Sequence, residues 1–427
     1  MELTLLFVVT FGLIALEIPV AFALLAGSLF YFLTSSPLPI GIVVQRMAPG
    51  IDSFPLLAIP LFVLAGNLLN QGGIAARIFT FATALVGHIR GGLAHVNVVA
   101  SLIFAGMSGV AQADAAGLGT VEIRAMRREG FDPAFAAAVS ASSAIVGPII
   151  PPSVIMVIYG VLAQVSVGDL FLAGIIPGFV IGLLLMITIF VLVETKRIYA
   201  PTRPRASLPG LGRAFLRAIA PLAAPVLLCA GLLLGVATPT ELGALTVVYA
   251  AGLGFFYREL TGPKLRRCLA DTLVTSGVLI FIMSAAVPFG WIISVNNVPA
   301  KLAETILGWT HDPIAVLMII NVFLLIVGCV METTAILLIA VPALLPLILQ
   351  LGIDPVHFGL VVILNLLIGA TTPPFGVLLF IVQYIAQVSF ARLLRAMLPF
   401  YVPLIIALVM LTYLPGLSLW LPRFVKG

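Results

Sequence analysis

Apolar stretches of about 20 residues recur along the whole chain, and they restrict its fold more than any other feature. Of the 427 residues, 62% are hydrophobic and only 9% are charged, whereas soluble domains carry about 25% charged residues. Residues 171–193 and 273–293 are each long enough to cross a bilayer as a helix. Barrel strands would instead give short alternating segments. The sequence therefore predicts an all-α polytopic membrane protein embedded in a lipid bilayer.

Basic residues in the predicted loops set the expected topology. The net charge of +5 is spread over helix ends, which argues against a nucleic-acid partner. The basic clusters expected on the cytoplasmic side are Lys196, Arg197, Arg203, Arg205, Arg213 and Arg217 in one loop, and Arg258, Lys264, Arg266 and Arg267 in another. Counting crossings from these loops places both termini outside, provided that residues 3–16 and 20–33 are separate spans broken at Glu17 and Pro19.

An internal repeat connects the two halves of the chain. The motif GFDP at residues 130–133 recurs as GIDP at residues 352–355, and VGPIIPP at 146–152 recurs as IGATTPP at 368–374. Both pairs are separated by the same 222 positions. A constant offset through several glycines and prolines is unlike chance similarity, so we expect two structural repeats.

The charges around the two repeats differ in a way that indicates opposite orientation. Arg90 and residues 124–128 flank the segment around Gly106, whereas residues 310–312 and 351–352, which flank its counterpart around Gly328, include no arginine or lysine. The first copy is therefore expected to enter from the cytoplasm and the second from outside. An inverted repeat of this kind is the arrangement of many secondary transporters.

Both copies of this segment are too long for one crossing and have polar, small-residue centres. We therefore predict two re-entrant helical hairpins, at residues 93–124 and 313–350. Their turns are expected at residues 106–109 and 328–334. Non-helical backbone at membrane depth persists only under protein or beside a water-filled cavity, so both tips should lie inside the molecule.

Two Gly/Pro-rich breaks interrupt the predicted helices 133–163 and 356–388 near their middles. Proline removes a backbone donor and blocks a helical hydrogen bond, which frees carbonyl oxygens. Together with serine and threonine hydroxyls, such oxygens suit Na⁺, and the following half-helix N-termini suit an anion. The candidate Na⁺ ligands are Ser108, Gly147, Pro148, Ile149, Pro152, Gly328, Thr333, Thr334, Gly369, Thr371 and Thr372. The alternative interpretation is that these prolines only kink helices.

Other residues near the tips are candidates for substrate binding or for shaping the hairpin. These candidates are Gly106, Gly109, Asp114, Ser153 and Glu332. The two carboxyl groups could cap backbone N–H groups, hold charge near the cations or carry a proton. Ser142 and Ser143 could pack helices or contact an ion. Three scattered cysteines predict neither a transition-metal site nor a disulfide framework, and we expect no cofactor apart from Na⁺ as the coupling ion.

The chain resembles the large membrane subunit of tripartite ATP-independent periplasmic (TRAP) transporters. The resemblance rests on residues 50–62, 106–114, 142–153 and 369–374 and extends over essentially the whole sequence. It implies an elevator-type, Na⁺-driven importer of an organic acid such as a C4-dicarboxylate, sialic acid or another sugar acid. A periplasmic binding protein would deliver that acid, and a separate small four-helix subunit would accompany the chain in the bacterial inner membrane. Gln112 is bulkier than the resemblance leads us to expect, which leaves open whether it contacts ion or substrate.

The resemblance also implies a division of the chain into fixed and moving parts. The expected parts are N-terminal scaffold helices at 1–70, an arm helix at 71–92, a first repeat at 93–195, a cytoplasmic loop with central scaffold helices at 196–295, a second arm at 296–312, a second repeat at 313–390 and a C-terminal helix at 391–427.

The chain has no GxxxxGK[ST] phosphate loop, so ATP does not drive it directly. Three other classes of protein remain as alternatives to the tripartite importer. An ion-coupled carrier of another inverted-repeat family would work without a binding protein, and a channel would conduct without saturation. An intramembrane serine protease would use Ser108 as nucleophile and His95 as base, although the expected protein is not an enzyme.

Overall fold

The computed structural model describes residues 2–34, 39–195, 198–201, 203–374 and 376–426, which form helices joined by short connections. Lys196 and Arg197 of the expected cytoplasmic loop lie outside the described residues. Within the described residues, seven helical segments are long and apolar enough to cross a membrane: Phe54–Gln71, α11 (Val167–Glu194), α12 (Leu208–Leu233), α13 (Pro239–Phe256), α14 (Gly262–Val295), α17 (Thr333–Gln350) and α20 (Phe390–Tyr413). The prediction of an all-α polytopic membrane protein is confirmed.

The N-terminal apolar run divides into two short helices, α1 (Glu2–Ala15) and α2 (Val20–Thr34). The chain turns between them at Glu17, whose φ of 64° is left-handed, and Pro19 precedes the second helix. The two helices pack against each other. At 14 and 15 residues, each is shorter than the roughly 20 residues of a full crossing.

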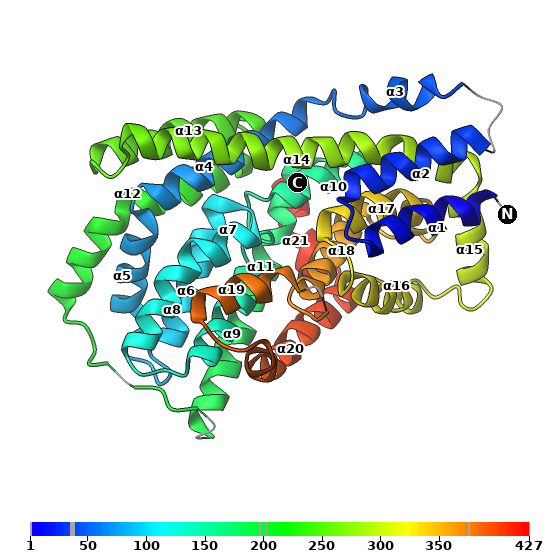
Figure 1. Ribbon diagram of the computed structural model, residues 1–427. Coiled ribbons are helices and arrows are strands. Elements are labelled where there is room, and N and C mark those ends of the chain that lie inside the picture. The colour runs from blue at the N-terminus through cyan, green and yellow to red at the C-terminus, as the bar shows by residue number, and fades with distance from the viewer. Residues whose placement is uncertain (1, 35–38, 196–197, 202, 375, 427) are drawn as a thin grey trace.

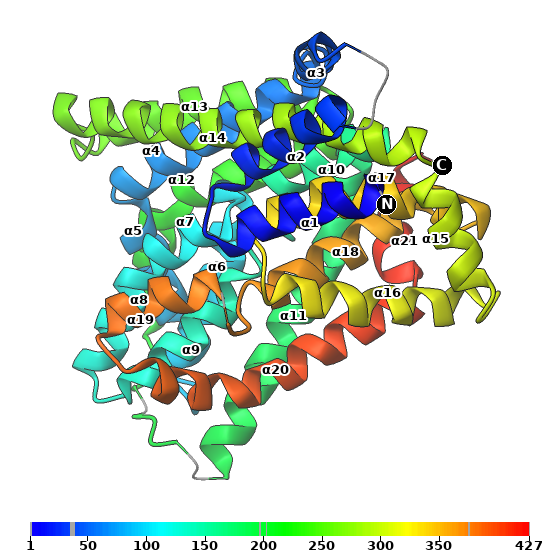
Figure 2. The ribbon, with the colours of Figure 1, turned by 45° about the vertical axis from the view of Figure 1, so that its right-hand side comes forward.

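The expected scaffold helices form a layer along one side of the molecule (Figures 1 and 2). The layer contains α3 (Gly41–Met47), the short 3₁₀ helix η1 (Phe54–Leu57), α4 (Ala58–Gln71), α13 and α14. Helix α4 packs against α13 and α14. At one end of the layer α5 (Ile74–Val86) packs against α12, and at the other end α15 (Val298–Leu307) packs against α17. Helices α5 and α15 fall within the two segments expected to be arms.

The two repeats contain matching elements. The first comprises α6 (Leu93–Ser108), α7 (Ala111–Ala116), α8 (Leu118–Arg128), α9 (Pro133–Ala144), α10 (Val154–Ala163) and α11. The second comprises α16 (Pro313–Gly328), α17, α18 (Pro355–Gly369), α19 (Val377–Ala386) and α20, followed by α21 (Gly416–Lys426). A cis peptide joins two prolines in each break. The helix therefore stops at both predicted breaks and resumes after them.

The repeated GFDP and GIDP motifs are helix starts. Asp132 accepts hydrogen bonds from the backbone N–H groups of Ala134 and Phe135, and Asp354 accepts one from Val356. A proline follows each aspartate at the first helical position, where its missing N–H is not needed. The motif thus fixes where α9 and α18 begin.

Removing this cap should weaken the fold by a predictable amount. Asp354 Oδ1 lies 2.9 Å from the nitrogen of Val356, and an N-cap of this type contributes about 1 kcal/mol. We expect Asp354→Ala to lower the free energy of unfolding by about 1 kcal/mol, measured by denaturant titration in detergent micelles. Asp354→Ser retains a capping oxygen and should fall within a few tenths of a kcal/mol of the parent. Equal losses for both variants would contradict the capping role.

The first hairpin turns slightly later than the sequence predicts. Gly106 lies inside α6, which continues to Ser108, and the turn consists of Gly109 and Val110. A Cβ atom at Gly106 would lie 2.3 Å from the Cβ of Pro225 in α12. Gly106 is therefore a close-packing position between helices and not part of the turn. In the second hairpin, residues 329–332 separate α16 from α17.

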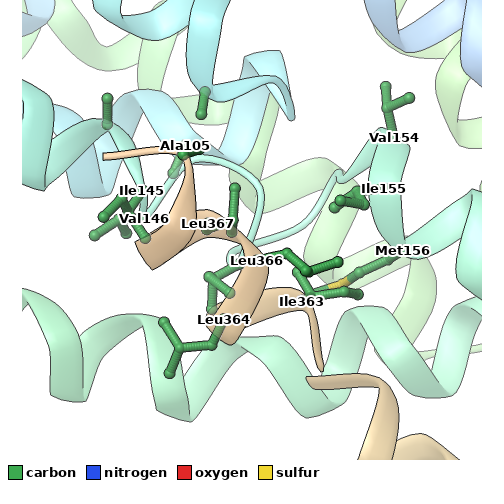
Figure 3. Packing of buried hydrophobic residues seen from close by; sticks show 14 of the residues in the cluster. Ala105, Ile145, Val146, Val154, Ile155, Met156, Ile363, Leu364, Leu366 and Leu367 are labelled. Carbon is green, nitrogen blue, oxygen red and sulfur yellow. The ribbon is translucent and has the colours of Figure 1, made fainter. Parts of the chain in front are cut away.

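The second half of each broken helix packs against the opposite repeat. Helix α10 packs against α17 and α18, whereas α19 packs against α7, α8 and α9. Buried apolar side chains fill the centre where these segments meet, including Val146, Val154, Leu366 and Leu367 (Figure 3). The two breaks therefore lie within one shared core.

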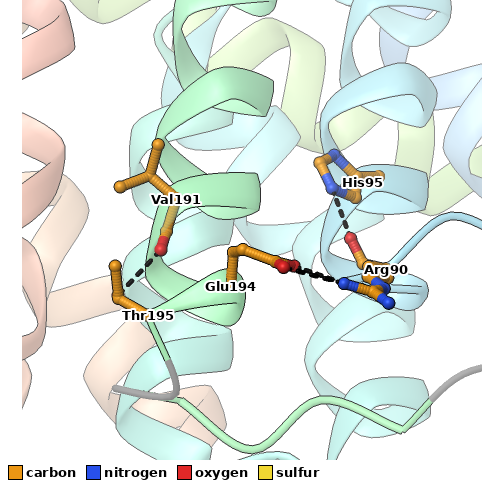
Figure 4. Close-up of polar contacts among 5 residues, drawn as sticks. All are labelled: Arg90, His95, Val191, Glu194 and Thr195. Atoms are coloured by element: carbon orange, nitrogen blue, oxygen red, sulfur yellow. Dashed lines mark hydrogen bonds and ion pairs between the residues drawn. The ribbon is translucent and has the colours of Figure 1, made fainter.

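An ion pair ties the start of the first hairpin to the end of α11 (Figure 4). Arg90 lies 2.7 Å from a carboxylate oxygen of Glu194, and Nε2 of His95 lies 2.9 Å from the carbonyl oxygen of Arg90. Both side chains of the ion pair are exposed, so it adds little stability. Its effect is to hold two ends of the first repeat next to each other.

Candidate functional site

The tip of the first hairpin rests directly on the first break. The hydroxyl of Ser108 donates a hydrogen bond to Oδ1 of Asp114, which is only 5% exposed. A Cβ atom at Gly147 would lie 2.0 Å from Oδ2 of the same carboxylate. Gly109 has a φ of +66°, and a Cβ atom there would lie 2.4 Å from the carbonyl oxygen of Pro152. These four residues and Asp114 form one cluster, which we call the first tip cluster.

The remaining candidates of the first repeat lie around this cluster. The hydroxyl of Ser153 caps α10 by accepting a hydrogen bond from the nitrogen of Met156 at 3.2 Å. Pro148 lines a cavity described below. The carbonyl oxygen of Ile149 lies 2.0 Å from the position of a Cβ atom at Gly174 in α11. This oxygen therefore contacts α11.

The second tip and break meet through two glycines. A Cβ atom at Gly369 would lie 2.8 Å from both the Cα and the carbonyl carbon of Gly328. The hydroxyls of Thr371 and Thr372 each donate to the carbonyl oxygen of Ile368 at 2.8 Å. Gly328, Gly369, Thr371 and Thr372 form the second tip cluster. Both hydroxyl oxygens retain lone pairs that could face a cation.

Glu332 is the N-cap of α17. Its carboxylate accepts hydrogen bonds from the backbone nitrogens of Thr334 and Ala335 at 2.9 and 3.1 Å, and from the hydroxyl of Thr334 at 2.9 Å. Such a carboxylate satisfies N–H groups that a helix start leaves unpaired. The sequence leaves three roles open for Glu332, and the structure shows it in one of them, as the cap of a helix start.

A cavity of about 260 Å³ lies between both hairpin tips, both broken helices and α14. Its polar lining residues are Gln112, Thr275, Glu332, Thr333 and Thr334. None of the lining residues is a lysine or arginine. The start of α10 and the start of α17 both lie at this cavity, because Val154 and Thr333 line it. Helix N-termini favour anions, but Ser153 caps the start of α10 and the carboxylate of Glu332 caps the start of α17.

The donor atoms in the two tip clusters are hydroxyl, carbonyl and carboxylate oxygens. Hard monovalent or alkaline-earth cations prefer such ligands, whereas transition metals prefer imidazole and thiolate. Within the described residues, no group of three or more histidines, cysteines, aspartates or glutamates could hold a metal ion. The oxygen atoms at the tips are thus of the type that hard cations prefer.

Sequence reasoning did not select Glu122 or Thr275. Glu122 lies in α8, is 1% exposed, and accepts a hydrogen bond from Ser140 at 3.2 Å. Its position inside a predicted membrane hairpin could have indicated a functional role, because carboxyl groups within membrane segments are rare and usually functional. Thr275 lies on a scaffold helix and meets the cavity only through tertiary packing, which periodicity does not reveal.

Ser142 and Ser143 take different partners. The hydroxyl of Ser142 donates to the carbonyl oxygen of Ala138 at 2.8 Å within its own helix. That of Ser143 donates to the amide oxygen of Asn97 on α6 at 2.7 Å. Both interactions belong to helix structure and helix packing.

The protease interpretation fails on helix geometry. Ser108 and His95 lie on the same helix, α6, thirteen residues apart, which corresponds to about 20 Å along its axis. Ser108 bonds to Asp114 and His95 bonds to the carbonyl oxygen of Arg90. A serine nucleophile needs its base within hydrogen-bond reach.

Comparisons with known proteins agree with this architecture. The family model for the DctM component of tripartite ATP-independent periplasmic transporters matches residues 7–417. The sialic acid TRAP transporter large permease protein SiaM of Vibrio cholerae is 42% identical over 417 residues, covering 97% of each chain. The C4-dicarboxylate TRAP transporter large permease protein DctM of Pseudomonas aeruginosa is 36% identical over 374 residues, covering 87% of each.

A solved structure shares the fold at low sequence identity. The YdaH transporter of Alcanivorax borkumensis, whose crystal structure revealed an unusual topology, is similar with a TM-score of 0.64 at 16% identity, and 89% of each chain is covered. The family match extends over nearly the whole sequence, and both relatives are large permease subunits. The chain thus belongs to the family of DctM components, the large permease subunits of tripartite ATP-independent periplasmic transporters.

Proposed function

We propose that this subunit imports an organic acid across the bacterial inner membrane by coupling it to the entry of Na⁺. The observation that carries the proposal is the cavity of about 260 Å³ between both hairpin tips, both breaks and α14. It lies where elements of both repeats meet a scaffold helix, as a substrate site between a moving body and a fixed one would. The oxygen-rich tip clusters beside it are the proposed Na⁺ sites.

The proposed substrate is a carboxylate whose negative charge would be offset by Na⁺ bound at the two tip clusters. Among the described residues, no lysine or arginine lines the cavity, whereas the starts of α10 and α17 reach it and Glu332 adds a carboxylate to its lining. Gln112 and Thr275 supply side-chain donors for hydroxyl or carboxylate oxygens. Relatives named for sialic acid and for C4-dicarboxylates support a small organic acid as the substrate.

The proposed energy source is the Na⁺ gradient, and the proposed motion is that of an elevator. A membrane potential of 100 mV contributes about 2.3 kcal/mol for each charge moved inward. Na⁺ bound at each cluster would fix both tips around the carboxylate, and the loaded repeats would then slide along the scaffold. The shared core at the two breaks supports movement of both repeats as one body.

The proposal includes two protein partners. A periplasmic binding protein would deliver the acid, and a small four-helix membrane subunit would complete the scaffold. The tripartite nature of the family supports both partners. The exposed apolar side chains along the outer helices of the scaffold layer, such as Leu245 and Val248 of α13, offer a membrane-facing surface for either lipid or that subunit.

Reconstituted uptake tests the proposal. Proteoliposomes that contain this chain and its small partner would be given labelled organic acids, with and without the binding protein and an inward Na⁺ gradient. Uptake that requires both supports the proposed importer and identifies its substrate. Uptake without the binding protein would instead indicate a carrier that works alone, and unsaturable flux would indicate a channel.

The threonine pair of the second tip cluster provides a sharper test of Na⁺ binding. Thr371→Val with Thr372→Val removes both hydroxyls at nearly constant volume, and we expect Na⁺-dependent uptake to fall at least about tenfold, since each hydrogen-bonding ligand contributes about 1 kcal/mol. The measurement is the Na⁺ concentration that gives half-maximal uptake. Thr195→Val removes an exposed hydroxyl that bonds to Val191 and is the matched control. An unchanged Na⁺ dependence of the double variant would remove both residues from the site.

A further inference from the structure

Five polar side chains form a buried cluster inside the first repeat, away from the cavity. They come from α6, α8 and α9, and each is at most 6% exposed: Asn97, Ser101, Glu122, Ser140 and Ser143. A buried cluster of this kind is stable only when its members satisfy one another. One carboxyl group among four neutral side chains is the unusual member.

The hydrogen bonds of the cluster run in one direction. Ser101 donates to Ser143 at 3.0 Å, and Ser143 donates to the amide oxygen of Asn97 at 2.7 Å. The amide nitrogen of Asn97 donates to Ser140 at 2.6 Å, and Ser140 donates to Oε2 of Glu122 at 3.2 Å. The chain of donors therefore ends at Glu122. Its second oxygen, Oε1, is buried without a hydrogen-bond partner.

No cationic side chain neutralises this carboxyl group. Among the described residues, no lysine, arginine or histidine forms an ion pair with Glu122. The titratable groups on α8 and on the helices packed against it are Arg124, Arg127 and Arg128 on α8, Arg77 on α5, His95 on α6, Asp114 on α7 and Tyr384 on α19, whereas α9 has none. The three arginines of α8 are exposed, and Arg77 lies over the ring of Tyr257 at 3.8 Å. The nearby Asp114 is a further acid.

An ionised Glu122 would thus be an unpaired buried charge, which costs several kcal/mol. Proteins avoid that cost by protonation of the group or by binding a cation. Only one oxygen of the cluster lacks a partner. A single free oxygen can carry a proton, whereas a hard metal ion needs about six oxygen ligands. The geometry therefore favours a proton over a metal ion as the species that binds to Glu122.

The second repeat shows that helix packing does not require this carboxyl group. The offset of 222 positions, which relates Gly106 to Gly328 and Gly130 to Gly352, places Leu344 opposite Glu122 and Asn365 opposite Ser143. Asn365 donates to the backbone and side-chain oxygens of Asn321 at 2.9 and 3.1 Å. Asn321 also donates to the hydroxyl of Thr412 in α20 at 2.8 Å, so neutral side chains join these helices of the second repeat, and Leu344 is buried. Of these two equivalent positions, the one in the first repeat has a carboxyl group and the one in the second does not.

We propose that Glu122 is a proton-binding site of this subunit, protonated in the conformation described and deprotonated when α6 and α8 lose their contacts with the arm helix α5. Protonation supplies a hydrogen on one carboxyl oxygen and removes the buried charge. The effect on uptake rests on the proposed function, because movement of the repeats would then release or take up a proton. The protonation itself does not depend on it.

Infrared difference spectroscopy tests the protonation directly. The purified protein in lipid is compared at acidic and alkaline pH, and we expect a protonated-carboxyl band that disappears in Glu122→Gln and remains in Asp114→Asn. A band unaffected by Glu122→Gln would overturn the proposal. Glu122→Leu is the second variant, because the second repeat already accepts leucine at the equivalent position. Loss of the band in both variants, with unchanged elution as a folded protein, supports the site.

The pH profile of uptake tests the release of the proton. One titrating proton changes the rate by at most about tenfold per pH unit. We expect Glu122→Gln and Glu122→Leu to abolish the part of the uptake profile in which the rate changes with this slope. An unaltered profile in both variants would overturn the release step. A profile that stays the same while the Na⁺ dependence changes would show that Glu122 binds a metal cation instead. Failure of uptake in the parent protein would count against the proposed function and leave the infrared result valid.

Discussion

Gly369→Ala is expected to reduce Na⁺-driven uptake by about 10- to 100-fold. A Cβ atom at this position would lie 2.8 Å from the backbone of Gly328, and backbone atoms cannot yield as a flexible side chain can. The second tip would have to withdraw from the break, at a cost of about 1–3 kcal/mol, and each 1.4 kcal/mol corresponds to tenfold. The measurement is the initial rate of uptake at saturating Na⁺.

Gly252→Ala is the matched control for this substitution. Gly252 lies within α13, and nothing lies within 4 Å of a Cβ atom built there. Alanine is the better residue in a helix interior by about 1 kcal/mol, so uptake should be unchanged and thermal stability equal or higher. If Gly369→Ala transports as well as Gly252→Ala, close contact between tip and break is not required for transport.

Asp114→Asn removes a charge from the first tip cluster, and we expect it to weaken Na⁺ binding by a comparable factor. The carboxylate accepts a hydrogen bond from the hydroxyl of Ser108 and contacts Gly147, so it belongs to the cluster where a cation would bind. A hydrogen bond to a charged group contributes about 1.5–3 kcal/mol, which corresponds to about 10- to 150-fold in affinity. We expect the Na⁺ concentration for half-maximal uptake to rise by that factor, while detergent-solubilised protein remains folded.

An exposed acid provides the comparison. Asp271 lies one helical turn from Arg267 at 3.7 Å, and its side chain is 57% exposed. Asp271→Asn removes a surface ion pair of little consequence, so its Na⁺ dependence should match that of the parent. A small effect at Asp114, equal to that at Asp271, would assign Asp114 a purely structural hydrogen bond.

Local signals in the sequence predicted most of the fold. Prolines and glycines define both breaks because they remove hydrogen bonds at the positions where they stand, and the caps Asp132 and Asp354 mark the starts of α9 and α18. Composition was enough to predict the membrane location. These features depend on a few neighbouring residues, which is why they can be read from the chain alone.

Features that depend on distant contacts were missed or displaced. Gly106 looked like part of a turn, yet its small size serves contact with Pro225, more than a hundred residues away. The carbonyl oxygen of Ile149 contacts Gly174 because α11 packs beside the break. Glu122 lies in a helix with three exposed arginines, so its own burial shows only when α6 and α9 are in place.

One local signal was available but overlooked. The four residues Ala-Gln-Val-Ser occur at 163–166 and again at 386–389. In both places glutamine ends a helix in the left-handed conformation, with a φ of 55° at Gln164 and at Gln387. The repeat therefore extends beyond the breaks, with a shift of one residue. Gaps of that size conceal similarity when a single offset is assumed.

The packing of α10 on the second repeat and of α19 on the first has a consequence for how such a chain could arise. A half-length precursor would expose the apolar face of its own second half-helix, because the surface that covers it belongs to the other repeat. Two identical copies inserted in opposite directions would cover each other. The interlocked halves are thus the arrangement expected after duplication and fusion of a gene whose product was an antiparallel homodimer.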